Sequence, residues 1–143
     1  MQFDPKLLEI FLELNYKFNV VSLLNSNVNL ALKLGFNGIH CNRTQLEQIQ
    51  NYKKSFQYVF YSAHNIQSLE KADIMGASGI TISPIFKTAD KGIPLGIKFL
   101  KQINPKNYQA EIFALGGIIS TTEISALKQT QVQNFASIRY FLN

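Results

Sequence analysis

Three apolar segments of the sequence each lead into residues that can bind a small molecule or move a proton. The first ends in Ser62-Ala63-His64-Asn65, and the His64 imidazole can exchange protons near neutral pH. After the second, Thr88 offers a hydroxyl and Lys91 a positive charge, a combination that suits a phosphate. The third ends in Gly116-Gly117, where two glycines let the backbone approach a ligand closely. Together these residues predict a site for a phosphorylated small molecule.

Each of these groups also has a purely structural interpretation. His64 suits a loop histidine that caps the next helix, and Gly116-Gly117 suits a tight turn. The polar segment over residues 87–96 suits a solvated surface loop, although long polar loops are commonly lids or binding loops. The choice depends on where the fold brings these residues.

The elements that must position these residues alternate between two patterns. Some segments carry apolar residues at helical spacing, and others are short, apolar and extended, with glycine-marked turns between them. The expected helices cover residues 5–14, 25–34, 44–54, 66–75, 97–103 and 121–128. The expected strands cover residues 19–24, 38–41, 56–62, 79–83, 112–115 and 132–138, and a tail follows over residues 140–143.

Helix-capping residues support these bounds. Asp4 precedes the first expected helix as an N-cap residue. Thr44 with Glu47, and Ser120 with Glu123, match the spacing of a capping box. We therefore expect helices to begin at these positions.

Strict alternation of helix and strand favours an α/β fold with a parallel sheet and crossover helices. Periodicity alone leaves two architectures open, an open doubly wound sheet and a TIM-type βα barrel. In both architectures the chemistry lies at the carboxyl ends of the strands. A flavodoxin-like sheet with a regulatory role lacks support, because no acidic cluster marks a phospho-acceptor site.

Composition indicates one ordinary globular domain over residues 1–143. Hydrophobic residues make up 46% of the 143 residues, and the formal net charge is +5. The lysines are scattered, which argues against a nucleic-acid partner. Cys41 is the single cysteine, so neither a disulfide within the chain nor a cage of thiolates around a metal is expected. No apolar run suits a membrane span and the first residues carry no leader pattern, so we expect a cytoplasmic protein.

Five motifs in order along the chain resemble those of thiamine-phosphate synthases and of the related thiazole tautomerases (TenI). Gly38-Ile39-His40 is similar to their Gly-Val-His strand, and Ser62-Ala63-His64-Asn65 to their Ser-x-His strand. Leu24–Ala31 is similar to the family's strand-3 segment, which holds its first magnesium aspartate. Gly79–Phe86, with Thr88 and Lys91, resembles the family's strand 6 and its Pro-Ile-Phe-x-Thr-x-x-Lys continuation, and Ala114–Ile118 resembles its Ala-Ile-Gly-Gly-Ile strand.

The resemblance implies a TIM-type βα barrel from thiamine biosynthesis, here truncated to about six parallel strands with flanking helices. The first two strands of the family, with the segment that grips the pyrophosphate, have no counterpart. Its two magnesium-binding aspartates are also replaced, the first by Ser26 and the second near Gln45. We therefore expect no cofactor, although the synthase family implies Mg²⁺. The two unpaired sheet edges of such a barrel favour a homodimer.

The resemblance further implies a ligand, a phosphorylated thiazole-type molecule, and a set of roles. His64 would act as acid/base in thiazole tautomerisation, Ser62 and Asn65 would bind substrate, and Thr88, Lys91, Gly116 and Gly117 would bind the phosphate. A true synthase, which is a transferase, and a non-catalytic relative that binds phosphate ligands are the alternatives.

Three further residues have assigned expectations. Arg139 replaces a small residue of the family and is expected on the surface, with a phosphate contact as the alternative. His40 lies inside an apolar strand and is expected to be structural, and Cys41 beside it to be a buried small hydrophobe.

Overall fold

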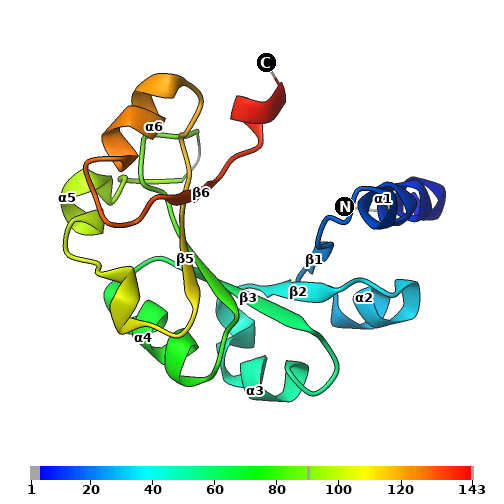
Figure 1. The fold of residues 1–143 in the computed structure, drawn as a ribbon. Helices are drawn as coiled ribbons and strands as arrows, with labels where there is room; N and C mark the ends of the chain where they lie inside the picture. Colours follow the sequence, from blue (N-terminus) through cyan, green and yellow to red (C-terminus); the bar gives the residue numbers. More distant parts are fainter. Residues whose placement is uncertain (1–3, 90, 143) are drawn as a thin grey trace.

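The computed structural model describes residues 4–89 and 91–142 and contains a six-stranded parallel sheet. Each strand pairs with the next strand along the chain, so the spatial order follows the sequence order. Figure 1 shows the strands as an arc that stays open between its first and last members. The strands are β1 (Leu23–Asn25), β2 (Gly38–Cys41), β3 (Tyr58–Ala63), β4 (Gly79–Ile82), β5 (Glu111–Leu115) and β6 (Asn134–Ala136).

Helices connect successive strands, and α3 to α6 lie along the outer side of the arc (Figure 1). This arrangement is a half-barrel, so the TIM-type barrel is confirmed over the doubly wound sheet. The α-helices are α1 (Pro5–Lys17), α2 (Val28–Leu34), α3 (Ile49–Tyr52), α4 (Ile66–Ile74), α5 (Gly96–Leu100) and α6 (Thr121–Leu127). Three 3₁₀-helices are η1 (Arg43–Gln48), η2 (Pro105–Asn107) and η3 (Arg139–Leu142).

The two faces of the sheet differ in burial because successive strand residues point to opposite sides. The outer face packs against the helices and is almost wholly apolar. The inner face is only half-buried at His40, Phe60 and Phe113. The fully buried outer-face residues include Ile39, Cys41, Val59, Ile80, Ile82, Ile112 and Ala114. The core therefore lies between sheet and helices, and the inner face remains available to polar residues.

Cys41 has no exposed surface and is a small core residue, as predicted. Burial raises the pKa of its thiol to about 12, so the thiol stays protonated and inert at neutral pH.

Two of the three predicted helix starts are confirmed. The Asp4 side chain accepts a hydrogen bond from the Lys6 amide at 3.0 Å. Ser120 and Glu123 form the expected capping box of α6. These caps satisfy amide groups that have no partner within the helix.

The predicted capping box of Thr44 and Glu47 is wrong. Asn42 and Gln45, two residues earlier, form the box, and the segment winds first as η1 and only then as α3. Asn42 accepts from the Thr44 amide at 3.0 Å and also from the Thr44 hydroxyl at 2.8 Å. Both spacings fit the same motif, and asparagine is about as good an N-cap as threonine, so local preference does not separate them. The bond from the Gln45 side chain to the Ser26 carbonyl at 2.9 Å favours the earlier box.

Several predicted bounds are too wide. The strand expected over residues 19–24 begins only at Leu23, because Asn19 has φ 53° and the Val20 amide still bonds to the Asn15 carbonyl at 2.8 Å. The strand expected over residues 132–138 is limited to β6, and the helix expected over residues 97–103 is α5. Most of the predicted tail forms η3, and Asn143 lies outside the described residues.

None of the helices in residues 4–89 and 91–142 combines the length and apolar character that crossing a membrane requires.

Candidate functional site

His64 follows β3 and is oriented by the end of the neighbouring strand. Its Nδ1 lies 2.7 Å from the Ser83 carbonyl oxygen, just beyond β4. A carbonyl oxygen can only accept, so Nδ1 carries the proton and the neutral ring has its lone pair on Nε2. The side chain is exposed, so this nitrogen can reach a ligand. The geometry therefore fits a general base, or an acid when the ring is protonated.

Asn65 caps the next helix. Its Oδ1 accepts from the Ser68 amide at 2.8 Å and thereby begins α4. The side-chain amide nitrogen remains as a donor toward solvent. The sequence also allowed His64 to cap this helix, but Asn65 is the residue that caps α4.

Ser62 lies on the inner face of the sheet beside His40, a residue that sequence reasoning expected to be structural. His40 Nε2 is 3.0 Å from the Ser62 hydroxyl and 3.3 Å from the Thr81 hydroxyl. Burial lowers the pKa of His40 below its ordinary value of 6.5, so the ring is neutral at physiological pH. A polar cluster thus lines the inner face, and strand register, which the sequence does not reveal, is what assembles it.

Gly116-Gly117 touches the loop that follows β4. The Phe86 amide bonds to the Gly116 carbonyl at 3.0 Å, and a Cβ on Gly117 would stand 2.7 Å from the Lys87 carbonyl oxygen. Both glycines also have positive φ, 98° and 70°. Only glycine fits here, because any side chain would push the loop away. The loop and the turn therefore pack directly against each other.

Thr88 lies in this loop and contacts the start of η3. Arg139 Nη2 donates to the Thr88 hydroxyl at 3.2 Å. Arg139 and Lys91 are both exposed, as expected for Arg139. Asp90, between the two predicted phosphate ligands, lies outside the described residues.

The structure links most of the predicted site residues through short contacts. Ser83, which orients His64, is followed by Pro84, whose Cα would lie 2.8 Å from a Cβ on Gly116. The importance of the Ser83 carbonyl has no signal in the sequence, since any residue offers one. His64, the loop after β4 and the glycine turn therefore occupy one end of the half-barrel.

The carboxyl ends of β1 and β2 carry a different chemistry. Ser26 and Gln45 stand where the resemblance places magnesium-binding aspartates, and the Gln45 amide donates to the Ser26 carbonyl at 2.9 Å. Asn42 donates to the Ser26 hydroxyl at 3.0 Å. Mg²⁺ favours carboxylate and phosphate oxygens, and these neutral groups already bond to one another. They do not fit the ion, and the described residues contain no cluster of three metal-binding side chains.

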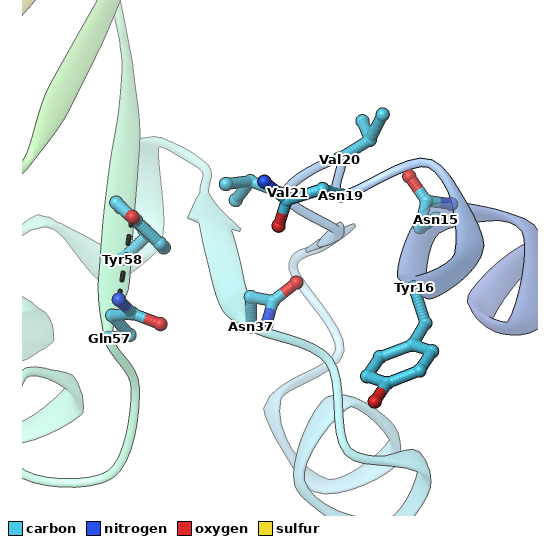
Figure 2. A pocket seen from close by; sticks show the side chains of 8 residues that line it. All are labelled: Asn15, Tyr16, Asn19, Val20, Val21, Asn37, Gln57 and Tyr58. Carbon is cyan, nitrogen blue, oxygen red and sulfur yellow. Dashed lines mark hydrogen bonds between the residues drawn. The ribbon is translucent and has the colours of Figure 1, made fainter.

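Two pockets lie outside the cluster around His64. One is open and borders the Ser26–Gln45 network, with Asn25, Asn29 and Tyr52 in its wall. The other, of about 230 Å³, lies between the end of α1 and the starts of β2 and β3, where Asn15, Asn37 and Tyr58 line it (Figure 2). The latter pocket is at the amino ends of the strands, away from the predicted chemistry.

The protein is thus a parallel βα half-barrel that carries a histidine, a hydroxyl, cationic groups and a glycine turn at the carboxyl ends of its strands. A family model described as thiamine monophosphate synthase matches residues 6–141. The chain belongs to this family, as the sequence motifs predicted.

Individual relatives agree with this assignment. A protein of Aquifex aeolicus (strain VF5), provisionally named thiamine-phosphate synthase 2, is 31% identical over 133 residues, which are 90% of this chain and 70% of the relative. A thiamine-phosphate synthase of Prochlorococcus marinus is 30% identical over 126 residues, 85% of this chain. This chain spans only 36% of that longer relative.

A solved structure shows the same fold. The thiamine phosphate pyrophosphorylase from Pyrococcus furiosus superposes with a TM-score of 0.77 over 96% of this chain and 69% of its own length. The sequences are 16% identical, so this likeness supports the fold alone.

Proposed function

We propose that the chain binds a phosphorylated thiazole at the carboxyl ends of β3 to β6 and catalyses its tautomerisation with His64 as acid/base. In this reaction His64 Nε2 removes a proton from one position of the ring and returns a proton at another. The observation that carries the proposal is the 2.7 Å contact from His64 Nδ1 to the Ser83 carbonyl, which leaves Nε2 basic and exposed.

The phosphate half of the proposal is supported by the loop after β4 and the glycine turn. Thr88 supplies a hydroxyl, Lys91 a charge, and Gly116-Gly117 the backbone freedom that lets amides face an anion. Ser62 and Asn65 complete the proposed substrate-binding set, Ser62 from the inner face and Asn65 from the start of α4.

The decisive experiment is His64→Gln measured for isomerisation of the thiazole carboxylate phosphate. Glutamine can still donate to the Ser83 carbonyl but cannot act as a base at neutral pH. We expect kcat to fall by about 10²- to 10⁴-fold while the ligand still binds. Turnover at the wild-type rate would contradict the proposal.

A true thiamine-phosphate synthase is the alternative, and it fits the names of the relatives equally well. The neutral Ser26–Gln45 network argues against it, because a pyrophosphate leaving group needs charge neutralisation. Incubation with pyrimidine pyrophosphate, thiazole phosphate and Mg²⁺ separates the two, since thiamine phosphate would form only in a synthase. Binding of thiazole phosphate with neither reaction would assign the third alternative, a non-catalytic relative.

We also propose a homodimer, because exposed apolar residues gather at the two open edges of the sheet. Leu7, Phe11 and Leu14 on α1 and Val20 and Val21 before β1 are between 42% and 63% exposed. At the other edge, Phe141 and Leu142 after β6 are 67% and 76% exposed. Patches of this kind are uncommon on isolated chains and typical of contact surfaces.

A second copy suits both edges at once. A twofold axis along the strands keeps all strands parallel and sets β1 of each copy beside β6 of the other. Light scattering after gel filtration tests this proposal, with Val21→Lys at the β1 edge as the disrupting variant. We expect a wild-type dimer and a monomeric variant, and a wild-type monomer at every concentration would overturn it.

A further inference from the structure

Three loop segments at the carboxyl end of the half-barrel, 86–88, 116–118 and 137–139, are tied into a ring. The first bonds to the second through the Phe86 amide and the Gly116 carbonyl at 3.0 Å. The second receives a 2.6 Å bond from the Ser137 hydroxyl to the Ile118 carbonyl. Arg139 closes the ring through its 3.2 Å bond to the Thr88 hydroxyl. Each segment therefore contacts both of the others.

The ring carries positive charge and unsatisfied donors. Lys87 and Arg139 are cationic, and none of the residues in the three segments is acidic. Among the hydrogen bonds of the described residues, none uses the Gly117 amide as donor. Thr88 accepts from Arg139, and no hydrogen bond within residues 4–89 and 91–142 uses its own hydroxyl proton, so this proton can be donated to a ligand. An anion is the ligand that such a set of donors favours.

We propose that Arg139 is a phosphate-binding residue of this site and sets its preference for a phosphorylated ligand over the corresponding alcohol. This inference rests on the proposed function and adds to it a residue from the start of η3, just after β6, that the family resemblance does not supply. Arginine suits the role because its planar guanidinium offers several donors, so one Nη can bond to Thr88 while the remaining N–H groups face the phosphate. The Thr88 contact orients the guanidinium before the ligand arrives, which reduces the entropy lost on binding.

A merely structural Arg139 would hold the loop after β4 in place and do nothing else. The two roles depend on different properties of the side chain. The contact with Thr88 needs only an N–H donor, whereas phosphate preference needs the positive charge. Arg139→Gln keeps a donor and removes the charge, so it separates the roles.

The experiment is calorimetric titration of the full chain with three probes: thiazole phosphate, the thiazole alcohol and inorganic phosphate. Arg139→Gln and Arg139→Lys are compared with the wild type and with Lys33→Gln, a control on α2 that removes the same charge far along the chain from the ring. We expect Arg139→Gln to bind both phosphates about tenfold more weakly and the alcohol unchanged. The phosphate affinity of Arg139→Lys should lie between those of Arg139→Gln and the wild type. Lys33→Gln should bind all three probes as the wild type does.

The outcomes separate the role of Arg139 from the proposed substrate of the site. Unchanged phosphate affinity in Arg139→Gln, or equal loss for phosphate and alcohol, would overturn the role of Arg139 while leaving the proposed function intact. Wild-type binding of inorganic phosphate that depends on Arg139, without binding of thiazole phosphate, would keep the anion site and overturn the proposed substrate. A wild type that binds none of the probes would overturn both.

Discussion

The two halves of the strand-end surface have opposite character. At the ends of β1 and β2, Ser26, Asn42 and Gln45 are neutral and satisfy one another through hydrogen bonds. After β3 and β6, His64 is held at Nδ1 by Ser83 and Arg139 by Thr88, and both side chains keep further donor or acceptor capacity. A closed network of neutral groups suits structure, and oriented groups with remaining capacity suit ligand binding.

This contrast locates the proposed chemistry more sharply than burial does. Both halves mix exposed and half-buried residues, and both belong to the same parallel sheet. What differs is charge and the number of groups left to bond a ligand. The following substitutions either exchange these properties between the halves or remove them.

Gly117→Ala should produce the largest effect. The new Cβ would stand 2.7 Å from the Lys87 carbonyl oxygen at φ 70°, so strain and collision add. We expect a loss of about 2 to 4 kcal/mol in the free energy of unfolding and loss of phosphate binding. Chemical denaturation and ligand titration measure the two effects.

Gly35→Ala is the matched control for this substitution. Gly35 has φ 75°, but a Cβ added there would meet no atom within 4 Å. In Gly35→Ala we expect the free energy of unfolding to fall by about 1 kcal/mol, from backbone strain alone, and ligand binding to stay at the wild-type level. Equal losses in the two variants would mean that the loop contact contributes nothing.

Carboxylates introduced at the ends of β1 and β2 should create a binding site for Mg²⁺ there. In Ser26→Asp with Gln45→Asp, we expect Mg²⁺ to raise the melting temperature, because a metal that binds only the folded state stabilises it. Ser26 has φ 61°, a conformation that aspartate tolerates better than most residues. Ser26→Asn with Gln45→Asn is the uncharged control. An Mg²⁺ response in the control or the wild type would show that charge is not what separates the halves.

The placement of the candidate site residues at one edge of the sheet could be predicted from the sequence, because parallel strands bring their carboxyl ends together. His64 and Gly116-Gly117 follow apolar strands, so their placement at one edge needs only the strand assignments. Arg139 and Thr88 are 51 residues apart, and nothing local pairs them. The bond between His40 and Ser62 likewise depends on strand register, which the sequence leaves undetermined.

The incorrectly predicted capping box shows again that contacts between distant residues limit what the sequence predicts. Asn42 with Gln45 and Thr44 with Glu47 fit one motif two residues apart. Local preference for either is small, so contacts at the end of β2 decide. The Gln45 bond to the Ser26 carbonyl is such a contact, and it comes from 19 residues away.

Asn65→Ala should have a moderate effect on stability. Its Oδ1 begins α4 by accepting from Ser68, and loss of such a cap costs about 1 kcal/mol. Asn65→Ser restores a cap but lacks the side-chain amide. Recovered stability with weakened ligand binding would assign the amide to the ligand, as the sequence predicts. Recovery of both would leave Asn65 with the capping role alone.

His40 should produce the smallest effect, a change in the pH dependence of stability. Burial lowers its pKa below 6.5, so near and below that pH the unfolded chain binds more protons than the folded chain. The free energy of unfolding should therefore fall as the pH drops from about 7.5 to about 5.5, and His40→Asn should lose less over the same interval. The carboxylates titrate in both proteins, so the difference between their denaturation curves isolates His40. Parallel curves would mean that the hydroxyls of Ser62 and Thr81 compensate the burial of the charged ring, and the inner face would then tolerate charge as readily as the strand ends do.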